Sequence, residues 1–415
     1  MEAALYGAVA GFEVTLFERG RLAENVRAWG HVGLFTEWKR NRSPLAVRLL
    51  TQRGTELATP DSYSNGRELA EYVMRLAGLE PLRGRICPQT EVVSLTRDAC
   101  LKSDFWGEPG RERYPFRLVT RGVAGEKLRF FDAVIDATGV YATPNYVGSG
   151  GAPCPGELVH ASHIDYQIPD ISGYDRGRFA NKHTLVVGSG HSAASALLAV
   201  ADWFHTAPAT RITWVVRRPL ASSGEVYYID PDDKISSRRR LGERANLLVH
   251  DNRVDFYSGT VIESIARTAL GFQVTLSNGQ VVECHNLVAH TGFRPDPALW
   301  RELQVVEHPA TGGPHGLSDV IMENNRRSGV GLSTGYAERK PLPPEFGTEG
   351  EPKKGDPRVA SPELVRLPEP NFFVIGIKSY GRDAGFLMQN GFRQVRDVYR
   401  LMAGDLELDL YNGEI

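Results

Sequence analysis

The residues best suited to chemistry lie near the middle of the chain, in the stretch HTLVVGSGHSAASALLAVADWF, residues 183–204. Gly188 allows a tight turn after a strand, Gly190 lets backbone approach a pyrophosphate, and the small Ala193 lets the next helix pack closely on the strand. The first turn of that helix offers backbone amides to phosphates. The spacing therefore predicts a dinucleotide site formed by Gly188, Ser189, Gly190, His191, Ser192 and Ala193. The alternative is a strand–helix turn that binds nothing.

The next expected strand, residues 211–216, ends at Arg217 and Arg218. In a dinucleotide fold the end of this strand faces the adenosine ribose, where an acidic residue would accept hydrogen bonds from the ribose hydroxyls. Two guanidinium groups suit a 2′-phosphate instead. Arg217 and Arg218 therefore favour NADPH over NADH, and the alternative is that they only solvate a strand end.

The elements that must position these residues belong to an ordinary globular chain. It has 415 residues, 41% hydrophobic and 24% charged, with a net charge of −2. This fits roughly two or three domains and a small-molecule substrate, with no nucleic-acid partner. No apolar run is long enough to span a bilayer and no signal-peptide pattern is present, which favours a cytoplasmic protein. The four cysteines form no CxxC motif, and we expect no metal site.

Residues 1–20 are typical of the end of a helix, a turn at Gly11 and a strand over residues 13–17. Glu18 follows this strand. In a dinucleotide fold an acidic residue at the end of the second strand binds the ribose hydroxyls of an adenosine, so Glu18 is a candidate for that role. A surface glutamate without function is the alternative.

Two further stretches in the first part of the chain have a distinctive composition or spacing of side chains. Residues 25–44 are rich in aromatic and basic side chains, Trp29 among them. These suit the edge of a flat ring system and equally a loop packed on a core. Residues 61–79 predict an amphipathic helix with Ser64 or Asn65 as its cap.

A series of short strands, then a buried strand and a Thr-Gly pair, occurs twice. Residues 90–135 have this pattern and lead to Thr138 and Gly139, and residues 254–290 lead to Thr291 and Gly292. Glycine after a strand lets backbone approach a nucleotide. We therefore expect an α/β fold with two Rossmann-like dinucleotide-binding domains, each with a small antiparallel meander.

The last part of the chain combines a loop-rich segment with a final strand and helix. Residues 307–368 are rich in glycine, proline and charge, and predict an irregular surface loop. Residues 371–405 predict a buried strand, a turn from Gly376 to Gly385 and an amphipathic helix. Such a helix start would stabilise negative charge on a cofactor, and simple packing is the alternative.

In combination, the stretches WGHVGLFTEW, GSGHSAA and FFVIGIKSYGRDAGFL resemble the flavin-containing monooxygenase-like branch of two-dinucleotide-domain flavoproteins, grouped with pyridine nucleotide-disulfide oxidoreductases. The resemblance covers the whole chain. It implies FAD in a discontinuous domain of residues 1–165 and 294–415, and NADPH in an inserted domain of residues 180–293. The candidates near the flavin ring are Trp29, Asn41, Tyr380 and Arg382, and Gly376 is a further candidate for binding a cofactor.

The chain departs from that family pattern at three places. Members begin with a strand and a GxGPxG motif, whereas this sequence starts where the last glycine is expected, so we expect a reading frame opened at an internal codon. Disulfide reductases of the class carry an acidic residue where this chain has Ile377. The monooxygenase fingerprint FxGxxxH keeps Gly156 and His160, while Cys154 replaces the aromatic residue.

Together these features predict an FAD- and NADPH-dependent oxidoreductase. The first hypothesis is a flavin monooxygenase that acts on a small substrate. The alternative is an NADPH-dependent reductase that passes electrons on without inserting oxygen, and the second alternative is a nucleotide-binding protein without flavin. No residue is identified as a general acid or base, and a homodimer is left open.

Overall fold

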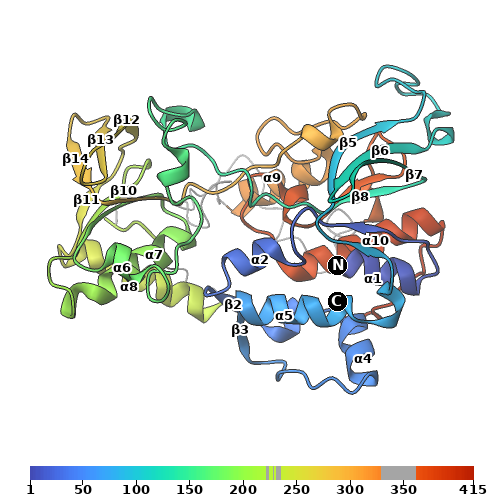
Figure 1. Ribbon diagram of the computed structural model, residues 1–415, viewed down its shortest axis with the longest axis horizontal. Coiled ribbons are helices and arrows are strands. Elements are labelled where there is room, and N and C mark those ends of the chain that lie inside the picture. Colours follow the sequence, from blue (N-terminus) through green and yellow to red (C-terminus); the bar gives the residue numbers. More distant parts are fainter. Residues whose placement is uncertain (221–223, 228, 230–234, 329–360) are drawn as a thin grey trace. The chain divides into compact units, whose positions relative to one another are not determined.

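The computed structural model describes residues 1–220, 224–227, 229, 235–328 and 361–415. The chain forms two compact units. Unit 1 comprises Met1–Ala142, Arg294–Arg327 and the described residues of Leu342–Ile415, and unit 2 includes Thr143–Phe293 as far as it is described. Figure 1 shows both units, and each is considered by itself below.

Unit 2 is built on a parallel sheet with β9 (His183–Val187) in its interior. β9 pairs with β10 (Arg211–Val215) on one side and with β15 (Asn286–Ala289) on the other, and β11 (Asp255–Tyr257) extends the sheet beyond β10. A three-stranded antiparallel meander completes the strands: β12 (Ile262–Arg267), β13 (Phe272–Leu276) and β14 (Val281–Cys284). The helices are α6 (Arg176–Phe179), α7 (His191–Ala201) and α8 (Ser236–His250).

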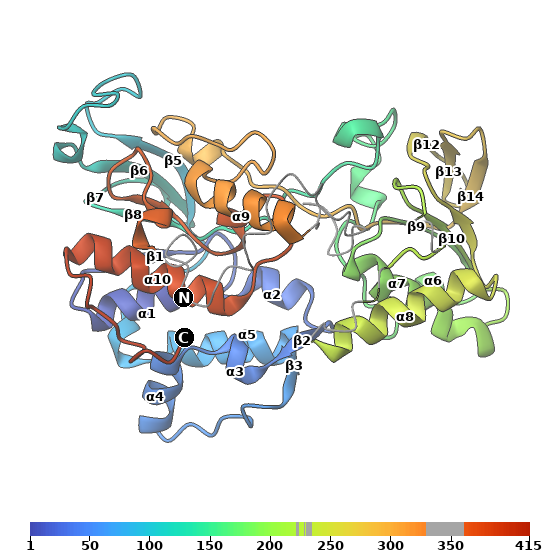
Figure 2. The same ribbon diagram turned by 180° about the vertical axis from the view of Figure 1, so that it is seen from behind.

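Alternation along β9 gives unit 2 two cores. Leu185 and Val187 pack in a cluster with residues of the meander, whereas Val186 packs in a second cluster with residues of α7 and α8. Successive side chains of a strand point to opposite faces, so a strand that is apolar throughout needs a cover on both. In Figure 2, α7 and α8 lie next to each other on the helical side of the sheet.

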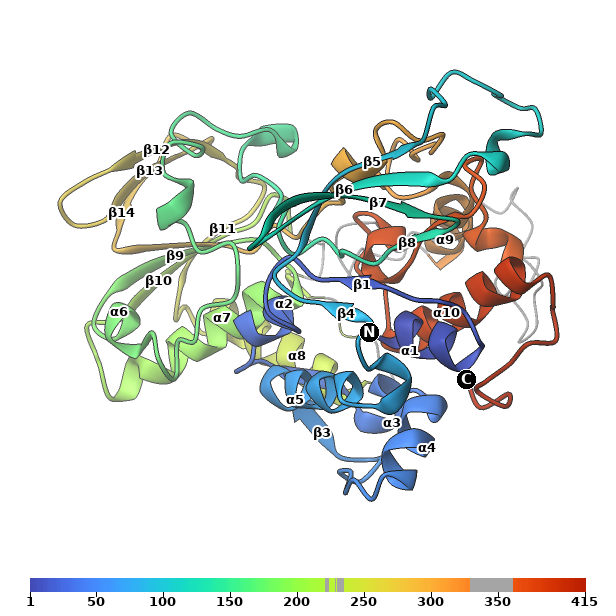
Figure 3. The same cartoon turned by 45° about the vertical axis from the view of Figure 1, so that its right-hand side comes forward.

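Unit 1 contains several small sheets. Its antiparallel meander consists of β5 (Glu91–Arg97), β6 (Phe116–Gly122) and β7 (Gly125–Phe131), which Figure 3 shows edge to edge. Two pairs of strands are parallel: β1 (Leu16–Phe17) with β4 (Ile86–Cys87), and β8 (Val134–Asp136) with β16 (Phe372–Val374). β2 (Gly33–Glu37) pairs with β3 (Tyr63–Asn65) in an antiparallel ribbon.

The main core of unit 1 is helical. The helices of the unit are α1 (Glu2–Val9), α2 (Glu24–Ala28), α3 (Trp38–Asn41), α4 (Pro44–Gln52), α5 (Gly66–Ala77), α9 (His315–Ser328) and α10 (Met388–Ala403). Residues of α1, α4, α5 and α10 share one apolar cluster. α5 begins at Asn65, whose side chain accepts a hydrogen bond from the Glu68 amide at 3.0 Å while Glu68 bonds back to the Asn65 amide. The predicted helix in residues 61–79 is therefore confirmed, with Asn65 as its cap.

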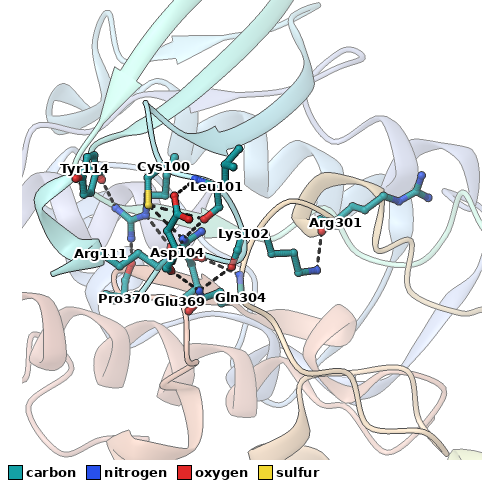
Figure 4. A network of polar contacts seen from close by, with 11 residues as sticks. Cys100, Leu101, Lys102, Asp104, Arg111, Tyr114, Arg301, Gln304, Glu369 and Pro370 are labelled. Carbon is teal, nitrogen blue, oxygen red and sulfur yellow. Dashed lines mark hydrogen bonds and ion pairs between the residues drawn. The ribbon is translucent and has the colours of Figure 1, made fainter. Parts of the chain in front are cut away.

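A buried cluster of charges links distant parts of unit 1 (Figure 4). The Glu369 carboxylate accepts hydrogen bonds from Arg97 Nε at 2.7 Å, from Arg111 Nε at 2.9 Å and from the Gln304 amide at 2.8 Å. The side chains of Arg97 and Glu369 are 0% exposed. Arg111 also donates to Cys100 Sγ at 3.3 Å. The cluster joins β5, the segment before β6 and the segment before β16.

The structure differs from the sequence predictions in three places. Residues 143–165, expected in the FAD-binding part, belong to unit 2, since the Ile265 amide of β12 bonds to Pro155 O at 2.9 Å. β11 is a parallel edge strand, although residues 254–257 were expected in the meander. The predicted irregular segment 307–368 contains α9, where Ser318 and Ile321 are buried three positions apart, as a helix requires. Residues 329–360 of that segment lie outside the described residues.

Candidate functional site

The turn after β9 can be built only with glycine at position 188. Gly188 has a φ of +122°, and a Cβ there would lie 2.2 Å from His290 O. Its amide donates to Val215 O at 3.0 Å, so the turn is fixed against both neighbouring strands. The left-handed φ and the close approach each exclude a side chain.

The next glycine of the turn has space instead of a close neighbour. Gly190 is the N-cap residue of α7, no side chain caps that helix, and a Cβ at Gly190 would meet nothing within 4 Å. The amides of Ser189, Gly190 and Ser192 find no acceptor within the described part of the chain. An open, uncapped helix start after a glycine turn fits a phosphate group. Ala193, 0% exposed, packs in the helical core as the spacing predicts.

The other candidates of unit 2 gather at the same edge of its sheet. Because β9, β10 and β15 are parallel neighbours, their carboxyl ends meet there. Arg217 and Arg218 follow β10; Arg217 is exposed, and burial followed by the charge of Arg217 lowers the pKa of the half-buried Arg218. Thr291 and Gly292 follow β15, where Thr291 Oγ1 donates to Asn145 O at 2.6 Å.

In unit 1, three predicted residues lie together at the ends of β8 and β16. Thr138 and Gly139 follow β8, and Gly376 follows β16, its parallel partner. Gly139 and Gly376 both have a φ of +71°, and a Cβ at Gly139 would lie 3.8 Å from Ile377 Cγ2. A Cβ at Gly376 would meet nothing within 4 Å. Two strand ends without side chains leave room for a ligand to approach the backbone.

A buried ion pair that was not predicted from the sequence joins these two strand ends. Lys378 Nζ donates to Asp136 Oδ2 at 2.7 Å and to Thr138 Oγ1 at 2.8 Å, and it lies 4.5 Å from the centroid of the Trp300 ring. Thr138 Oγ1 in turn donates to Asp136 Oδ1 at 2.8 Å. The Thr138 side chain is therefore engaged in this network. The signal in the sequence was a lysine beside a buried strand and an aspartate ending another, but neither shows its partner.

The contacts of Glu18, Trp29 and Asn41 in unit 1 are with residues other than those at the ends of β8 and β16. Glu18 follows β1, and its Oε1 accepts the Gly20 amide at 2.8 Å. Among the described residues its Oε2 accepts no hydrogen bond, so this oxygen could accept one from a hydroxyl. Trp29 packs on Gly66, where a Cβ would lie 2.5 Å from the indole. Asn41 is 2% exposed and bonds twice to Thr36, once to its hydroxyl and once to its carbonyl. The side chains of Trp29 and Asn41 thus have local structural contacts.

Tyr380 and Arg382 lie in the turn between β16 and α10. The Tyr380 hydroxyl accepts a hydrogen bond from Asn390 Nδ2 at 2.9 Å, and burial raises the pKa of Tyr380. Arg382 is exposed, and its amide donates to Thr311 O at 2.9 Å. This turn is therefore held by α10 on one side and by the segment before α9 on the other.

Other features limit the chemistry. All four cysteines are free, and Cys100, Cys154 and Cys284 are buried. The part of the chain that the structure describes has no group of three or more His, Cys, Asp or Glu side chains that could hold a metal ion. None of the described helices is long and apolar enough to cross a membrane.

The family can be assigned from the first three quarters of the sequence. Residues 1–313 match the family model of the pyridine nucleotide-disulphide oxidoreductases. The chain belongs to this family. The resemblance predicted from the sequence is confirmed at this level, and the protein is a pyridine nucleotide-disulphide oxidoreductase family enzyme with the expected two-domain α/β fold.

Solved structures with similar folds come from several kinds of flavin and nicotinamide enzymes. The bacillithiol disulfide reductase Bdr (YpdA) from Bacillus cereus has 15% identity and a TM-score of 0.64, over 97% of this chain and 95% of that chain. The ornithine hydroxylase PvdA from Pseudomonas aeruginosa has 15% identity and a TM-score of 0.55, over 96% of both chains. Thioredoxin reductase from T. acidophilum has 13% identity and a TM-score of 0.53, over 96% of this chain and 93% of that chain. At such identities the likeness is one of fold. No curated protein matches the chain.

Proposed function

We propose that the protein is an FAD- and NADPH-dependent oxidoreductase acting on a small substrate, and that its reaction is a monooxygenation. The observation that carries the proposal is the turn from Gly188 to Gly190, which combines an obligatory glycine with an open, uncapped helix start. The bound nicotinamide would supply a hydride and the bound flavin would pass electrons to oxygen. The residues of the protein would bind the two cofactors and orient them.

In unit 2, the proposed roles follow from the edge of the parallel sheet. The amides at the start of α7 would bind the pyrophosphate of NADPH, and Arg217 and Arg218 would bind its 2′-phosphate. Thr291 and Gly292, at the end of the neighbouring β15, would border the nicotinamide half. Burial and the charge of Arg217 lower the pKa of Arg218, and the negative charge of a bound 2′-phosphate would oppose that shift.

In unit 1, the residues present also fit an adenine dinucleotide. Glu18 retains one carboxylate oxygen for a ribose hydroxyl. Gly139 and Gly376 leave the ends of β8 and β16 without side chains. The ion pair between Lys378 and Asp136 would keep these two ends at a fixed distance when the flavin binds.

The cysteines argue against dithiol chemistry and so favour oxygen as the acceptor. Burial raises the pKa of Cys154 and of Cys284 to about 12, so both are protonated at neutral pH and neither is a nucleophile. Cys100 is also buried, and burial raises its pKa as well. Cys87 is partly exposed and has no second cysteine in a CxxC motif.

A reductase that passes electrons on without inserting oxygen is the second candidate. The observation in its favour concerns the monooxygenase fingerprint, FxGxxxH. A Cβ at Gly156 would lie 1.8 Å from Ile265 O, so packing against β12 alone accounts for this glycine. Bdr, a disulfide reductase by name, has the same overall fold.

Rapid mixing of the FAD-loaded protein with NADPH or NADH under anaerobic conditions tests the shared part of both candidates. We expect the visible absorbance of the flavin to bleach, and to bleach at lower concentrations of NADPH than of NADH. A protein that remains colourless after incubation with FAD would contradict the proposal and support a nucleotide-binding protein without flavin.

Oxygen uptake separates the two candidates. L-Ornithine and cadaverine are suitable first probes, since an ornithine hydroxylase and a cadaverine monooxygenase share the fold. A monooxygenase yields hydroxylated product in proportion to the oxygen consumed. Flavin reduction followed only by hydrogen peroxide, or by reduction of an added quinone, across a panel of small amines supports the reductase.

A further inference from the structure

Two aromatic side chains hold the carbonyl groups of the glycine turn in unit 2. Trp214 Nε1 donates to Gly188 O at 2.8 Å, and the Tyr227 hydroxyl donates to Gly190 O at 3.0 Å. Trp214 comes from β10, and Tyr227 from the segment before α8. Both carbonyls of the two glycines are therefore bonded to side chains that the dinucleotide motif itself does not contain.

The two donors form one rigid group. Trp214 is 0% exposed and Tyr227 is 1% exposed. Their rings are stacked at a centroid distance of 6.0 Å and an interplanar angle of 23°. Phe256 of β11 packs against Trp214 from another side, with ring centroids 5.1 Å apart. Buried, stacked rings have few rotamers available, so the positions of both donor atoms are fixed.

The position of Tyr227 is set by α8. Asn246 Oδ1 accepts a hydrogen bond from the Tyr227 amide at 3.0 Å, and Asn246 Nδ2 donates to the Tyr227 carbonyl at 2.8 Å. A Cβ at Gly242 would lie 3.2 Å from Tyr227 Cβ, so glycine in the middle of α8 makes room for this segment. Glycine destabilises a helix interior relative to alanine, and the close approach of Tyr227 explains why α8 has a glycine at this position.

Planarity of the peptide bond connects these donors to the ligand side of the turn. In a trans peptide the carbonyl of one residue and the amide of the next point in opposite directions. Since Gly188 O and Gly190 O point to buried rings, the amides of Ser189 and His191 point away from the core. Gly190 O also accepts the Ala194 amide of α7 at 3.1 Å, so Tyr227 supplies a second donor to the first helical carbonyl.

We propose that Trp214 and Tyr227 are positioning residues for the pyrophosphate of the bound dinucleotide, because they fix the peptide planes whose amides face it. This inference rests on the proposed function, since it assumes that NADPH binds at the turn. Neither side chain touches the ligand; each acts through a carbonyl. Without the Trp214 bond, no side chain of the described residues holds the peptide plane after Gly188. Without the Tyr227 bond, the plane after Gly190 keeps only the Ala194 amide as a donor and is held less firmly, so in both cases the amides are less well aligned.

The test compares two ligands and two hydroxyl deletions by isothermal titration calorimetry. NADP⁺ contains a pyrophosphate, whereas adenosine 2′-monophosphate contains the 2′-phosphate expected at Arg217 and Arg218 but no pyrophosphate. Tyr227→Phe removes one hydroxyl and keeps the ring. Tyr166→Phe is the matched control, because it removes a hydroxyl that donates to Glu157 at 2.8 Å elsewhere in unit 2.

We expect Tyr227→Phe to raise the Kd for NADP⁺ about three- to tenfold, the range of one net hydrogen bond, and to leave the Kd for adenosine 2′-monophosphate unchanged. Tyr166→Phe should change neither. In turnover, Tyr227→Phe should raise KM for NADPH more than it lowers kcat. If Tyr227→Phe does not fold, Gly242→Ala shifts the same segment and should give the same selective loss.

Three results would overturn the inference in distinguishable ways. An unchanged Kd for NADP⁺ in folded Tyr227→Phe would show that the hydroxyl does not position the turn. An equal loss for both ligands would indicate a general loosening of unit 2. A wild-type protein that binds neither ligand would refute the proposed function as well.

Discussion

Replacing Glu369 with glutamine removes one charge from the buried cluster in unit 1 and leaves its shape almost unchanged. The carboxylate accepts hydrogen bonds from two guanidinium groups and one amide, and its side chain is 0% exposed. In Glu369→Gln one of the two oxygens becomes an amino group that faces donors. Arg97 and Arg111 would then be buried with no anion beside them.

The expected cost follows from burial. Removing one partner of a buried ion pair destabilises a protein by about 3 to 5 kcal/mol, because the other charge stays desolvated and unpaired. Arg111 Nη2 already lacks a hydrogen-bond partner among the described residues, and burial lowers the pKa of Arg97 although Glu369 opposes the shift. The other acceptors of the two arginines are backbone carbonyls and the Cys100 thiol, which carry no negative charge to replace that of Glu369. At about 1.4 kcal/mol per factor of ten, local protection should fall by about two to three and a half orders of magnitude.

Hydrogen exchange followed by mass spectrometry measures this cost segment by segment. We expect amides of β5 and β6 to lose protection in Glu369→Gln and those of β9 and β10 to keep it, because the latter belong to the other unit. Glu363→Gln is the matched control: Glu363 pairs with Arg366 at 2.6 Å, but the side chains are 63% and 58% exposed. An exposed pair contributes at most about 1 kcal/mol. Equal losses in the two variants would refute the assignment of a structural role to the buried cluster.

Further predictions concern unit 2. Gly188→Ala should abolish NADP⁺ binding, since its Cβ would lie 2.2 Å from His290 O. Gly190→Ala should weaken NADP⁺ binding at least tenfold and leave the melting temperature unchanged, because its Cβ enters open space. Calorimetric titration measures the affinities of both variants, and thermal unfolding measures their melting temperatures. Replacing Arg217 and Arg218 with serine should reduce the ratio of kcat/KM for NADPH to that for NADH at least tenfold, which steady-state kinetics measure. Burial lowers the pKa of His290 from 6.5 to about 4. The unfolded chain therefore gains a proton that the folded chain does not, and stability should fall by up to about 3 kcal/mol as the pH drops from about 6.5 to about 4.

The glycine and histidine predictions have controls in the same unit. A Cβ at Gly177 would meet nothing within 4 Å and lies outside the turn, so Gly177→Ala should bind NADP⁺ normally. His205 is exposed, so His205→Gln should retain the dependence of stability on pH that a His290→Gln variant loses. A Gly188→Ala variant with normal affinity, an unchanged cofactor preference, or the same pH dependence without His290 would contradict the respective argument.

The parts of the structure that were predicted correctly depend on signals contained in a few neighbouring residues. The cap at Asn65 precedes Glu68 by three positions, and the two side chains complete a capping box. The turn at Gly188 follows an apolar strand directly, and the small residue Ala193 falls where the helix meets the sheet. In each case the physical cause and the residues it requires lie within one turn of chain.

The predictions that were wrong depend on partners that local signals do not contain. Residues 143–165 join unit 2 because Asp165 pairs with Val288 of β15, more than a hundred positions away. The residues of β11 directly precede the meander in the sequence and were therefore assigned to it. β11 is instead a parallel edge strand because it pairs with β10. α9 was obscured by the glycine and proline content of the residues around it.

The buried charged residues also depend on partners that lie far away in the sequence. Single charged residues are usually exposed, so a sequence alone assigns them to the surface. Arg97 and Glu369 are 272 positions apart and Asp136 and Lys378 are 242 positions apart, and each pair is buried because the fold brings the two together. Trp214 and Tyr227 reach the glycine turn over 26 and 37 positions. The turn itself can therefore be predicted from a motif, but the groups that orient its peptide planes cannot. A motif transplanted without Trp214 and Tyr227 should keep its glycines and lose affinity, since glycine permits a peptide orientation and does not enforce one.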